Sequence, residues 1–378
     1  MTSERITSLP KQSMSRVASF DLARGLAVLF MMLVHVMDFY GQPGIGETAF
    51  GKIIKFLGSP PAAPIFTFIM GIFIASSSRQ SLASGLARAA WLLALGYMLN
   101  LARGSLPMWL SLQMGLVTYE QLGGYTPLTE LLIVDILQFA GLALAICVLL
   151  KHYFPDPRYW IVAGLAVVCL SPALWDISSG WMVPDAALQL LWGSKEQGAM
   201  FPLFPWLAFP LFGMAFGHWF GQSGCHTRFF RKTLWAGLVL MTAGTSLILF
   251  DMDFHYGYYL RSGPGGVIWI TGFVMVWLWL CRLIVGKAGS NRCLALLFFW
   301  SQNVTVIYVL QWLVIGWGLM LVGAQQLDLT NTMLAMAVVV LLSDLASRVW
   351  LRLRGHHHPA QAIESGSQTT ADPKLTAR

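Results

Sequence analysis

Four ionisable side chains lie in the first hydrophobic stretch of the chain, residues 20–40: Asp21, Arg24, His35 and Asp38. If this stretch is one α-helix, the eleven-residue step from Arg24 to His35 turns through about 1100°, which is ~20° beyond three full turns. Both side chains then project from one face, about 16 Å apart along the axis. Histidine titrates near neutral pH, which suits a general base. This face is predicted to hold the two ends of a long substrate with an anionic head.

Two carboxylates are candidates for the partner of His35. Asp38 lies one helical turn away, where it could bind the second ring nitrogen and stabilise an imidazolium. Asp135 belongs to a predicted span that runs in the opposite direction, which places it at about the depth of His35. Ionisable groups inside a membrane span are costly and by default indicate function. The sequence leaves open which carboxylate serves the histidine.

The composition indicates a polytopic membrane protein. The 378 residues are 56% hydrophobic and 11% charged, and the mean hydropathy is +0.64, which ordinary soluble domains do not reach. The net charge of +7 comes from basic residues dispersed among short loops, so no nucleic-acid partner is expected. Five cysteines without a CxxC spacing argue against a disulfide framework, and no metal site is predicted.

The hydrophobic runs predict an all-α fold with about ten transmembrane helices, between a tail at 1–19 and a polar, disordered tail at 353–378. The transmembrane domain is expected at 20–352, with long loops at 102–127 and 176–202. With the N-terminus inside, eighteen Lys and Arg fall in cytoplasmic segments and five outside, so both termini are predicted to be cytoplasmic. The predicted spans are 20–40, 60–78, 85–101, 128–150, 159–175, 203–221, 233–250, 266–285, 302–323 and 331–350.

Short motifs in a fixed order resemble the heparan-α-glucosaminide N-acetyltransferase catalytic family and its bacterial relatives. They begin with D-x-x-R-G-L-A-V-L-x-M-x-x-V-H at residues 21–35 and together cover most of residues 16–350. The Arg24–His35 spacing is also similar to the acyltransferase-three family of membrane O-acyltransferases. The further motifs are APIFTFIMG (63–71), Arg88 followed by WLLALG, DILQ (135–138), FPLFPWLAFPLFGMAFG (201–217) and SQNVTVIYVLQ (301–311).

The resemblance implies an acyl-CoA-dependent acetyltransferase. In this interpretation acetyl-CoA binds from the cytoplasm and its acetyl group passes to an amine or hydroxyl of an extracytoplasmic sugar or glycan. His35 would be the base or acyl carrier, and Arg24 and Arg88 would lie on the CoA-binding side. An oxyanion donor is also needed, and Gln138 or Asn303 could supply it.

The sequence departs from the family pattern at two places. Lysosomal relatives have asparagine at the position of His35 and a catalytic histidine in the next loop, whereas residues 41–51 contain no histidine. Gln311, three residues after Tyr308, stands where some relatives have histidine, so that position loses a titratable group. The catalytic assignment therefore rests on the bacterial and O-acyltransferase patterns.

Two other classes of protein stay open. A secondary transporter could use His35, Asp38 and Asp135 as a proton or substrate site, although no convincing internal repeat supports it. A non-catalytic partner in a glycan-synthesis complex would leave the intramembrane charges unexplained. The sequence favours an acetyltransferase of a bacterial inner membrane. Its expected partners are acetyl-CoA, a sugar or glycan and the lipid bilayer, and a homodimer is left open.

Overall fold

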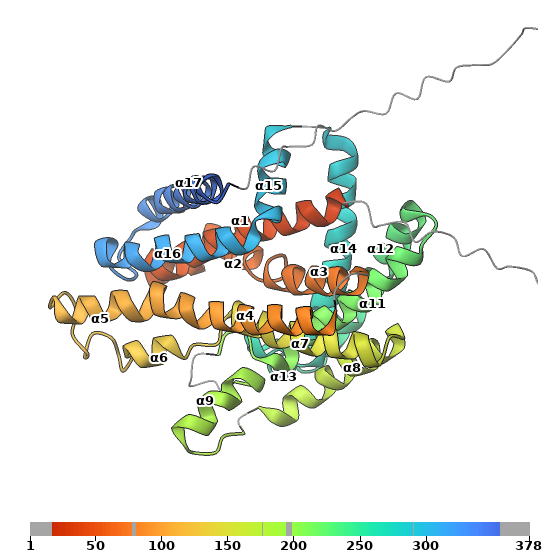
Figure 1. The fold of residues 1–378 in the computed structure, drawn as a ribbon, viewed down its shortest axis with the longest axis horizontal. Helices are drawn as coiled ribbons and strands as arrows, with labels where there is room; N and C mark the ends of the chain where they lie inside the picture. The colour runs from red at the N-terminus through yellow and green to blue at the C-terminus, as the bar shows by residue number, and fades with distance from the viewer. Residues whose placement is uncertain (1–16, 78–80, 176, 194–198, 290, 356–378) are drawn as a thin grey trace, which may run out of the picture.

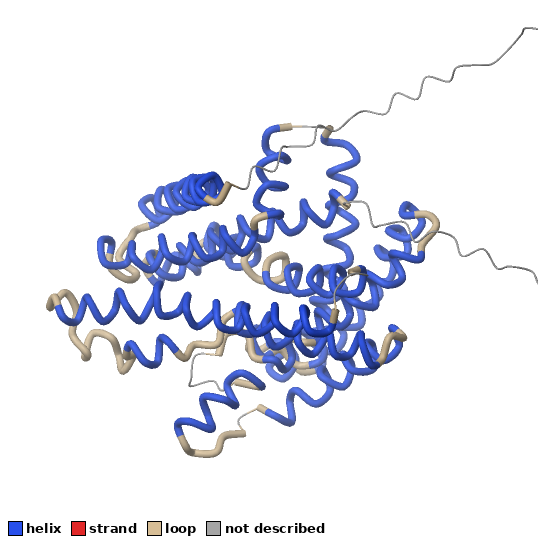
Figure 2. The backbone as a smooth tube through the Cα atoms, in the orientation of Figure 1, coloured by secondary structure: helices blue, strands red, loops and turns tan. Residues whose placement is uncertain are grey.

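A computed structural model shows an all-helical chain, as predicted (Figures 1 and 2). It describes residues 17–77, 81–175, 177–193, 199–289 and 291–355. Within these ranges, nine helical stretches are long and apolar enough to span a membrane. They are Ala18–Tyr40 (α1), Leu82–Gln113 (α4, η2 and α5), Ile136–Tyr153 (α7), Pro157–Leu174 (α8), Leu203–Gln222 (α10 and α11), His226–Phe250 (α12), Pro264–Ala288 (α14), Val304–Val322 (α16) and Leu329–Leu353 (α17).

Shorter helices lie between the long ones. Several of them, among them α2, α9 and α13, lie between the predicted spans, because helices of one to three turns are too short to give a clear hydrophobic period. The shorter elements are η1 (Pro43–Glu47), α2 (Ala49–Leu57), α3 (Ala63–Ser76), α6 (Pro127–Leu131), α9 (Met182–Leu191), α13 (Met252–Tyr256), η3 (Tyr259–Arg261) and α15 (Arg292–Gln302).

The predicted second span is the short helix α3, which has 14 residues. At 1.5 Å per residue it extends about 21 Å, less than the ~30 Å hydrocarbon core of a bilayer. It packs against α11 through glycines, because Gly71 lies on the carbonyl of Pro210 and Gly213 lies on the carbonyl of Phe68. A Cβ at either glycine would collide with the opposite backbone. Small residues thus let the two helices approach closely.

Two predicted spans have different boundaries in the structure. The third continues through the π-helical segment η2 (Leu101–Ser105) and α5 (Leu106–Gln113), so its outer part is helix and not loop. The fourth is broken before α7, because Asp135 is the N-cap of that helix. The Asp135 side chain accepts from the backbone N–H of Ile136 at 2.7 Å, and Gln138 Oε1 accepts from the Asp135 N–H at 3.2 Å. This capping box starts a helix inside a run that hydropathy alone reads as continuous.

Helix α1 lies at the centre of the arrangement (Figure 1) and contacts α3, α14, α15, α16 and α17. Its Phe20, Ala27 and Met32 are fully buried, as are Ile65 of α3 and Ile307 of α16. The helix that carries the predicted functional residues is therefore held on several sides by packed side chains.

Candidate functional site

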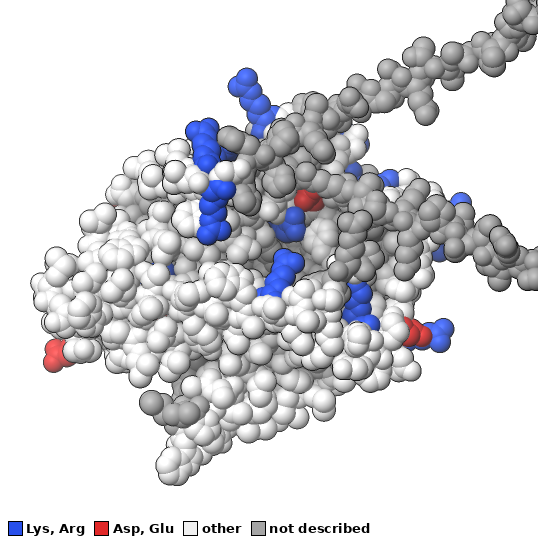
Figure 3. Space-filling view, in the orientation of Figure 1, with Lys and Arg blue, Asp and Glu red and all other residues white. Residues whose placement is uncertain are grey.

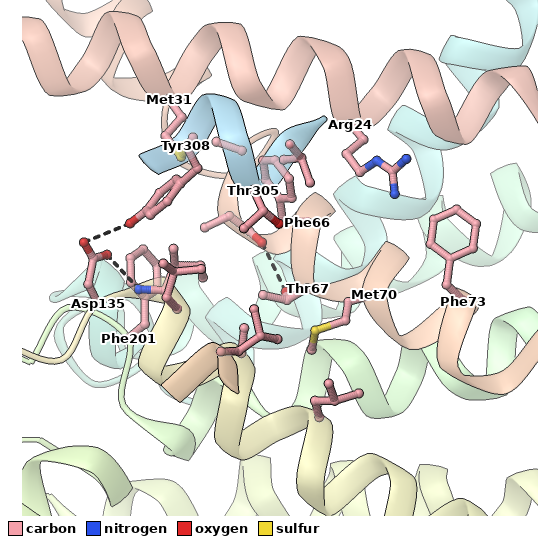
Figure 4. A pocket seen from close by; sticks show the side chains of 18 of the residues that line it. Arg24, Met31, Phe66, Thr67, Met70, Phe73, Asp135, Phe201, Thr305 and Tyr308 are labelled. Atoms are coloured by element: carbon pink, nitrogen blue, oxygen red, sulfur yellow. Dashed lines mark hydrogen bonds between the residues drawn. The ribbon is translucent and has the colours of Figure 1, made fainter. Parts of the chain in front are cut away.

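A cavity of about 440 Å³ lies between α1, α3, α4, α7 and α16. Arg24 and His35 both line it, which agrees with their predicted common face. Figure 4 shows Arg24 and Phe73 toward one end and Asp135 with Tyr308 toward the other. The wall between them is mainly apolar, and it includes Met31, Phe66, Met70, Leu92, Ala140 and Leu144. The cavity is thus mainly apolar, with charged or polar groups at both ends.

Arg24 is fixed at one end of the cavity. Its Nε donates to Ser301 Oγ at 2.9 Å and its Nη2 lies 3.2 Å from Asp21 Oδ1. Ser301 Oγ donates in turn to Asp21 Oδ1 at 2.7 Å. The guanidinium also lies 5.0 Å from the centre of the Phe73 ring. This network ties α1 to α15 and presents a positive charge at the cavity wall.

Arg88 lies on the same wall near the start of α4, and its side chain is exposed. Among the described residues it makes no hydrogen bond and no ion pair, so its charge is available to a ligand. Figure 3 shows Lys and Arg side chains around a hollow on this face of the molecule, with few acidic groups beside them. This end of the cavity is suited to an anionic head.

His35 is held by α16. Gln311 Nε2 lies 3.4 Å from His35 Nδ1, and the Trp312 ring packs on the imidazole with 4.2 Å between the ring centres. Gln311 is fully buried. The glutamine that replaces an expected histidine therefore contacts the predicted catalytic residue directly.

Asp135 lines the cavity near this end and is fixed by three donors. Tyr308 donates its hydroxyl to Oδ2 at 2.9 Å, Arg103 Nη2 lies 2.9 Å from Oδ2, and the Ile136 N–H binds Oδ1. The carboxylate is buried, with the Arg103 guanidinium as its counter-charge. A buried carboxylate needs such a partner, because an uncompensated buried charge is strongly destabilising.

Three other predicted site residues lie away from the cavity wall. Asp38 is exposed, and among the described residues its carboxylate forms no hydrogen bond or ion pair. Gln138 is buried and uses its side chain in the capping box and in a bond to the Ile133 carbonyl at 3.3 Å. Asn303 donates to the Phe299 carbonyl at 2.9 Å. The structure thus brings Arg24, Arg88, His35 and Asp135 to one cavity but not these three.

Sequence reasoning missed Arg103 and gave Tyr308 no role of its own. The loop predicted at 102–127 includes Arg103 because this segment mixes Gly and Ser with amphipathic residues, whereas the helix continues through Arg103 as the π-helical segment η2. Its signal was a lone arginine at the end of a long apolar helix on the side with few positive charges. Tyr308 was noticed only for its spacing from Gln311.

The helices and the cavity define an integral membrane protein with a site inside its helix bundle. The chain matches the family model described as heparan-alpha-glucosaminide N-acetyltransferase, catalytic, over residues 16–254. That match covers more than half of the chain and includes Arg24, His35, Arg88 and Asp135. A search of the curated proteins gave no match. The protein belongs to the heparan-α-glucosaminide N-acetyltransferase catalytic family, as the motifs had indicated.

Proposed function

We propose that the protein transfers the acetyl group of acetyl-CoA to an amine of a sugar or glycan on the opposite side of the membrane. The observation that carries this proposal is the single cavity that joins Arg24 and Arg88 to His35 and Asp135. A phosphorylated head would bind at the arginine end, and an extended pantetheine arm would lie along the apolar wall. The helical distance of about 16 Å between Arg24 and His35 is comparable with such an arm.

The sides of the membrane follow from the charge distribution. The arginine end of the cavity belongs to segments predicted to be cytoplasmic by their excess of Lys and Arg. Acetyl-CoA would therefore enter from the cytoplasm and the acceptor would approach His35 from the other side. The family description names a glucosaminide N-acetyltransferase, which supports a hexosamine-type amine as the acceptor.

In the proposed reaction, the acceptor nitrogen attacks the thioester carbon. A C–N bond forms, the C–S bond breaks, and His35 takes a proton from the nitrogen. That proton passes to the departing sulfur, so that free CoA leaves as a thiol. The Asp135 carboxylate at the same end of the cavity favours the transient imidazolium by its negative charge. A histidine that carries the acetyl group briefly would use the same geometry.

The first test is a thermal-shift titration of the purified protein with CoA and acetyl-CoA. A ligand that binds the folded state raises its apparent stability by mass action, so no acceptor is needed. We expect a saturable shift that weakens in Arg88→Ala, whose side chain has no partner among the described residues. Arg158→Ala is the matched control, because Arg158 is also exposed but does not line the cavity.

The proposal fails if folded protein shows no shift with either ligand at millimolar concentration, or if both variants weaken it equally. The first result would favour the alternative of a secondary transporter, which needs no coenzyme. The second would show that the shift reports general charge and not the cavity.

A further inference from the structure

Arg103 is a buried arginine outside the cavity wall. It lies in the π-helical segment η2, and its side chain is 6% exposed. π-Helical turns are rare in proteins, and those that occur are often found at functional sites. Gly316 of α16 packs on the backbone carbonyl of Arg103, where a Cβ would collide with it. The chain thus brings η2 and α16 into close contact at this arginine.

The Arg103 guanidinium contacts three side chains near the His35 end of the cavity. Its Nη2 lies 2.9 Å from Asp135 Oδ2 and donates to Asn100 Oδ1 at 3.2 Å. Its central carbon lies 3.8 Å from the centre of the Trp312 ring. The same ring packs on the imidazole of His35. One cation therefore holds both the carboxylate in the cavity wall and the aromatic ring against the histidine.

The contacts of Arg103 are not those expected of a residue that binds the coenzyme, nor those expected of an ion pair that only stabilises the fold. Arg103 does not line the cavity, and its charge faces Asp135, so it is not placed to bind the coenzyme. Its Nε and Nη1 have no hydrogen-bond acceptor among the described residues. Buried ion pairs are often no more stable than well-packed apolar side chains. An incompletely bonded buried ion pair is therefore weak evidence for a stabilising role.

We propose that Arg103 is a positioning residue for acyl transfer, which fixes the Asp135 carboxylate and the Trp312 ring so that His35 is held in its reactive orientation. This inference rests on the proposed function for the reaction that it serves. The planar guanidinium is needed for both contacts, because it binds the carboxylate at its edge and the indole through its face. Lysine keeps the charge but cannot form both contacts in the same way.

The test compares Arg103→Met and Arg103→Lys with the matched control Arg348→Met. Arg348 also pairs with a carboxylate, at 2.7 Å from Asp344, and also lies over a ring, 4.5 Å from the centre of Phe299. With acetyl-CoA and glucosamine as the probe acceptor, Arg103→Met is expected to lower kcat about a hundredfold, because a small misplacement of catalytic groups has effects of that order. The KM for acetyl-CoA is expected to stay within about twofold, since Arg103 lies away from the coenzyme wall.

Arg103→Lys is expected to fall between the wild type and Arg103→Met, and Arg348→Met is expected to keep the wild-type kcat. Thermal melts show which variants are folded at the assay temperature. If Arg103 positions the site, kcat falls in Arg103→Met protein that is still folded, and Arg103→Lys recovers part of it. A wild-type kcat in Arg103→Met would overturn the proposal.

A second measurement does not depend on turnover. Diethyl pyrocarbonate modifies neutral imidazole, and mass spectrometry gives its rate at His35 in each variant. We expect a faster rate in Arg103→Met, where the ring is no longer held through Trp312, and an unchanged rate in Arg348→Met. Equal rates in all proteins would overturn the positioning role even if the wild type proved inactive. Absence of acetyl-CoA binding in the wild type would instead contradict the proposed function.

Discussion

At the scale of single residues, the surroundings of His35 favour Asp135 over Asp38 as the carboxylate that we propose for it. Asp38 is exposed and does not line the cavity, whereas Asp135 lies in the cavity wall and its oxygens accept from three donors. Helical spacing made Asp38 the nearer candidate, but spacing gives proximity along one helix and says nothing about the neighbours of that helix. The geometry favours Asp135.

The comparison of Asp135→Asn with Asp38→Asn tests this preference. We expect Asp135→Asn to lower kcat about a hundredfold, within the range usual for acid–base groups, because the negative charge near the imidazolium is lost. Asp38→Asn is expected to stay close to the wild type. Kinetics of acetyl transfer to glucosamine give both values, and thermal melts show whether each variant is folded. A larger loss of kcat in Asp38→Asn than in Asp135→Asn would indicate that Asp38 is the catalytic carboxylate.

At the scale of elements, the sequence predicted most of the helices but not how they begin, end and pack. The long apolar runs gave the spans, and the common face of Arg24 and His35 followed from the helical period. The break at Asp135 depends on a capping box, and the burial of Arg103 depends on η2 meeting α16. Both features depend on contacts between residues, which a hydropathy profile does not describe. The residues that surround His35 in the cavity therefore could not all be predicted from the sequence.

The packing of α3 on α11 yields a prediction at this scale. Gly71→Ala places a methyl group against the Pro210 carbonyl and is expected to destabilise the fold by about 1–3 kcal/mol, as overpacking does. Gly286→Ala in α14 is the control, because no atom lies near its Cβ position. That change is expected to be neutral or to stabilise slightly, since alanine favours a helix. Denaturation in mild detergent gives both values, and equal effects would contradict the close α3–α11 contact.

Glu130 of α6, which lies outside the candidate spans, is expected to make the stability of the fold depend on pH. Burial raises the pKa of its carboxyl above the usual 4.5, although Arg103 opposes the shift. The folded state then holds this proton more tightly than the unfolded state, so the carboxyl lowers the stability as the pH rises above about 4.5. The glutamine in Glu130→Gln does not titrate. The melting temperature of this variant, relative to that of the wild type, is therefore expected to rise as the pH increases above 4.5. A difference in melting temperature that stays constant or shrinks as the pH rises would contradict the proposed effect of Glu130.

At the scale of the whole molecule, the orientation in the membrane fixes which substrate meets which end of the cavity. Helices α12 and α14 pack antiparallel, since Gly237 meets Gly272 and Gly244 meets Gly265. The start of α12 and the end of α14 therefore lie at the same end of the pair. The excess of Lys and Arg predicts that this end is cytoplasmic.

Two native thiols test the orientation. Cys225 and Cys293 are exposed; Cys225 is the N-cap of α12, and Cys293 lies in the first turn of α15, the helix that follows α14 in the chain. A hydrogen bond from the Arg228 backbone lowers the pKa of the Cys225 thiol, which increases its reactivity near neutral pH. We expect a membrane-impermeant maleimide to label both only after cells are opened. Labelling in intact cells would reverse the orientation and, with it, the proposed side of the coenzyme.

The central claim is that one cavity carries an acetyl group from a donor on one side of the membrane to an acceptor on the other. The most direct measurement uses sealed proteoliposomes with glucosamine trapped inside and labelled acetyl-CoA added outside. The account predicts N-acetylglucosamine in the lumen, from the protein molecules whose arginine end faces out, and its loss by about a thousandfold in His35→Ala. Product formed only when donor and acceptor share a side, or formed equally by His35→Ala, would contradict it.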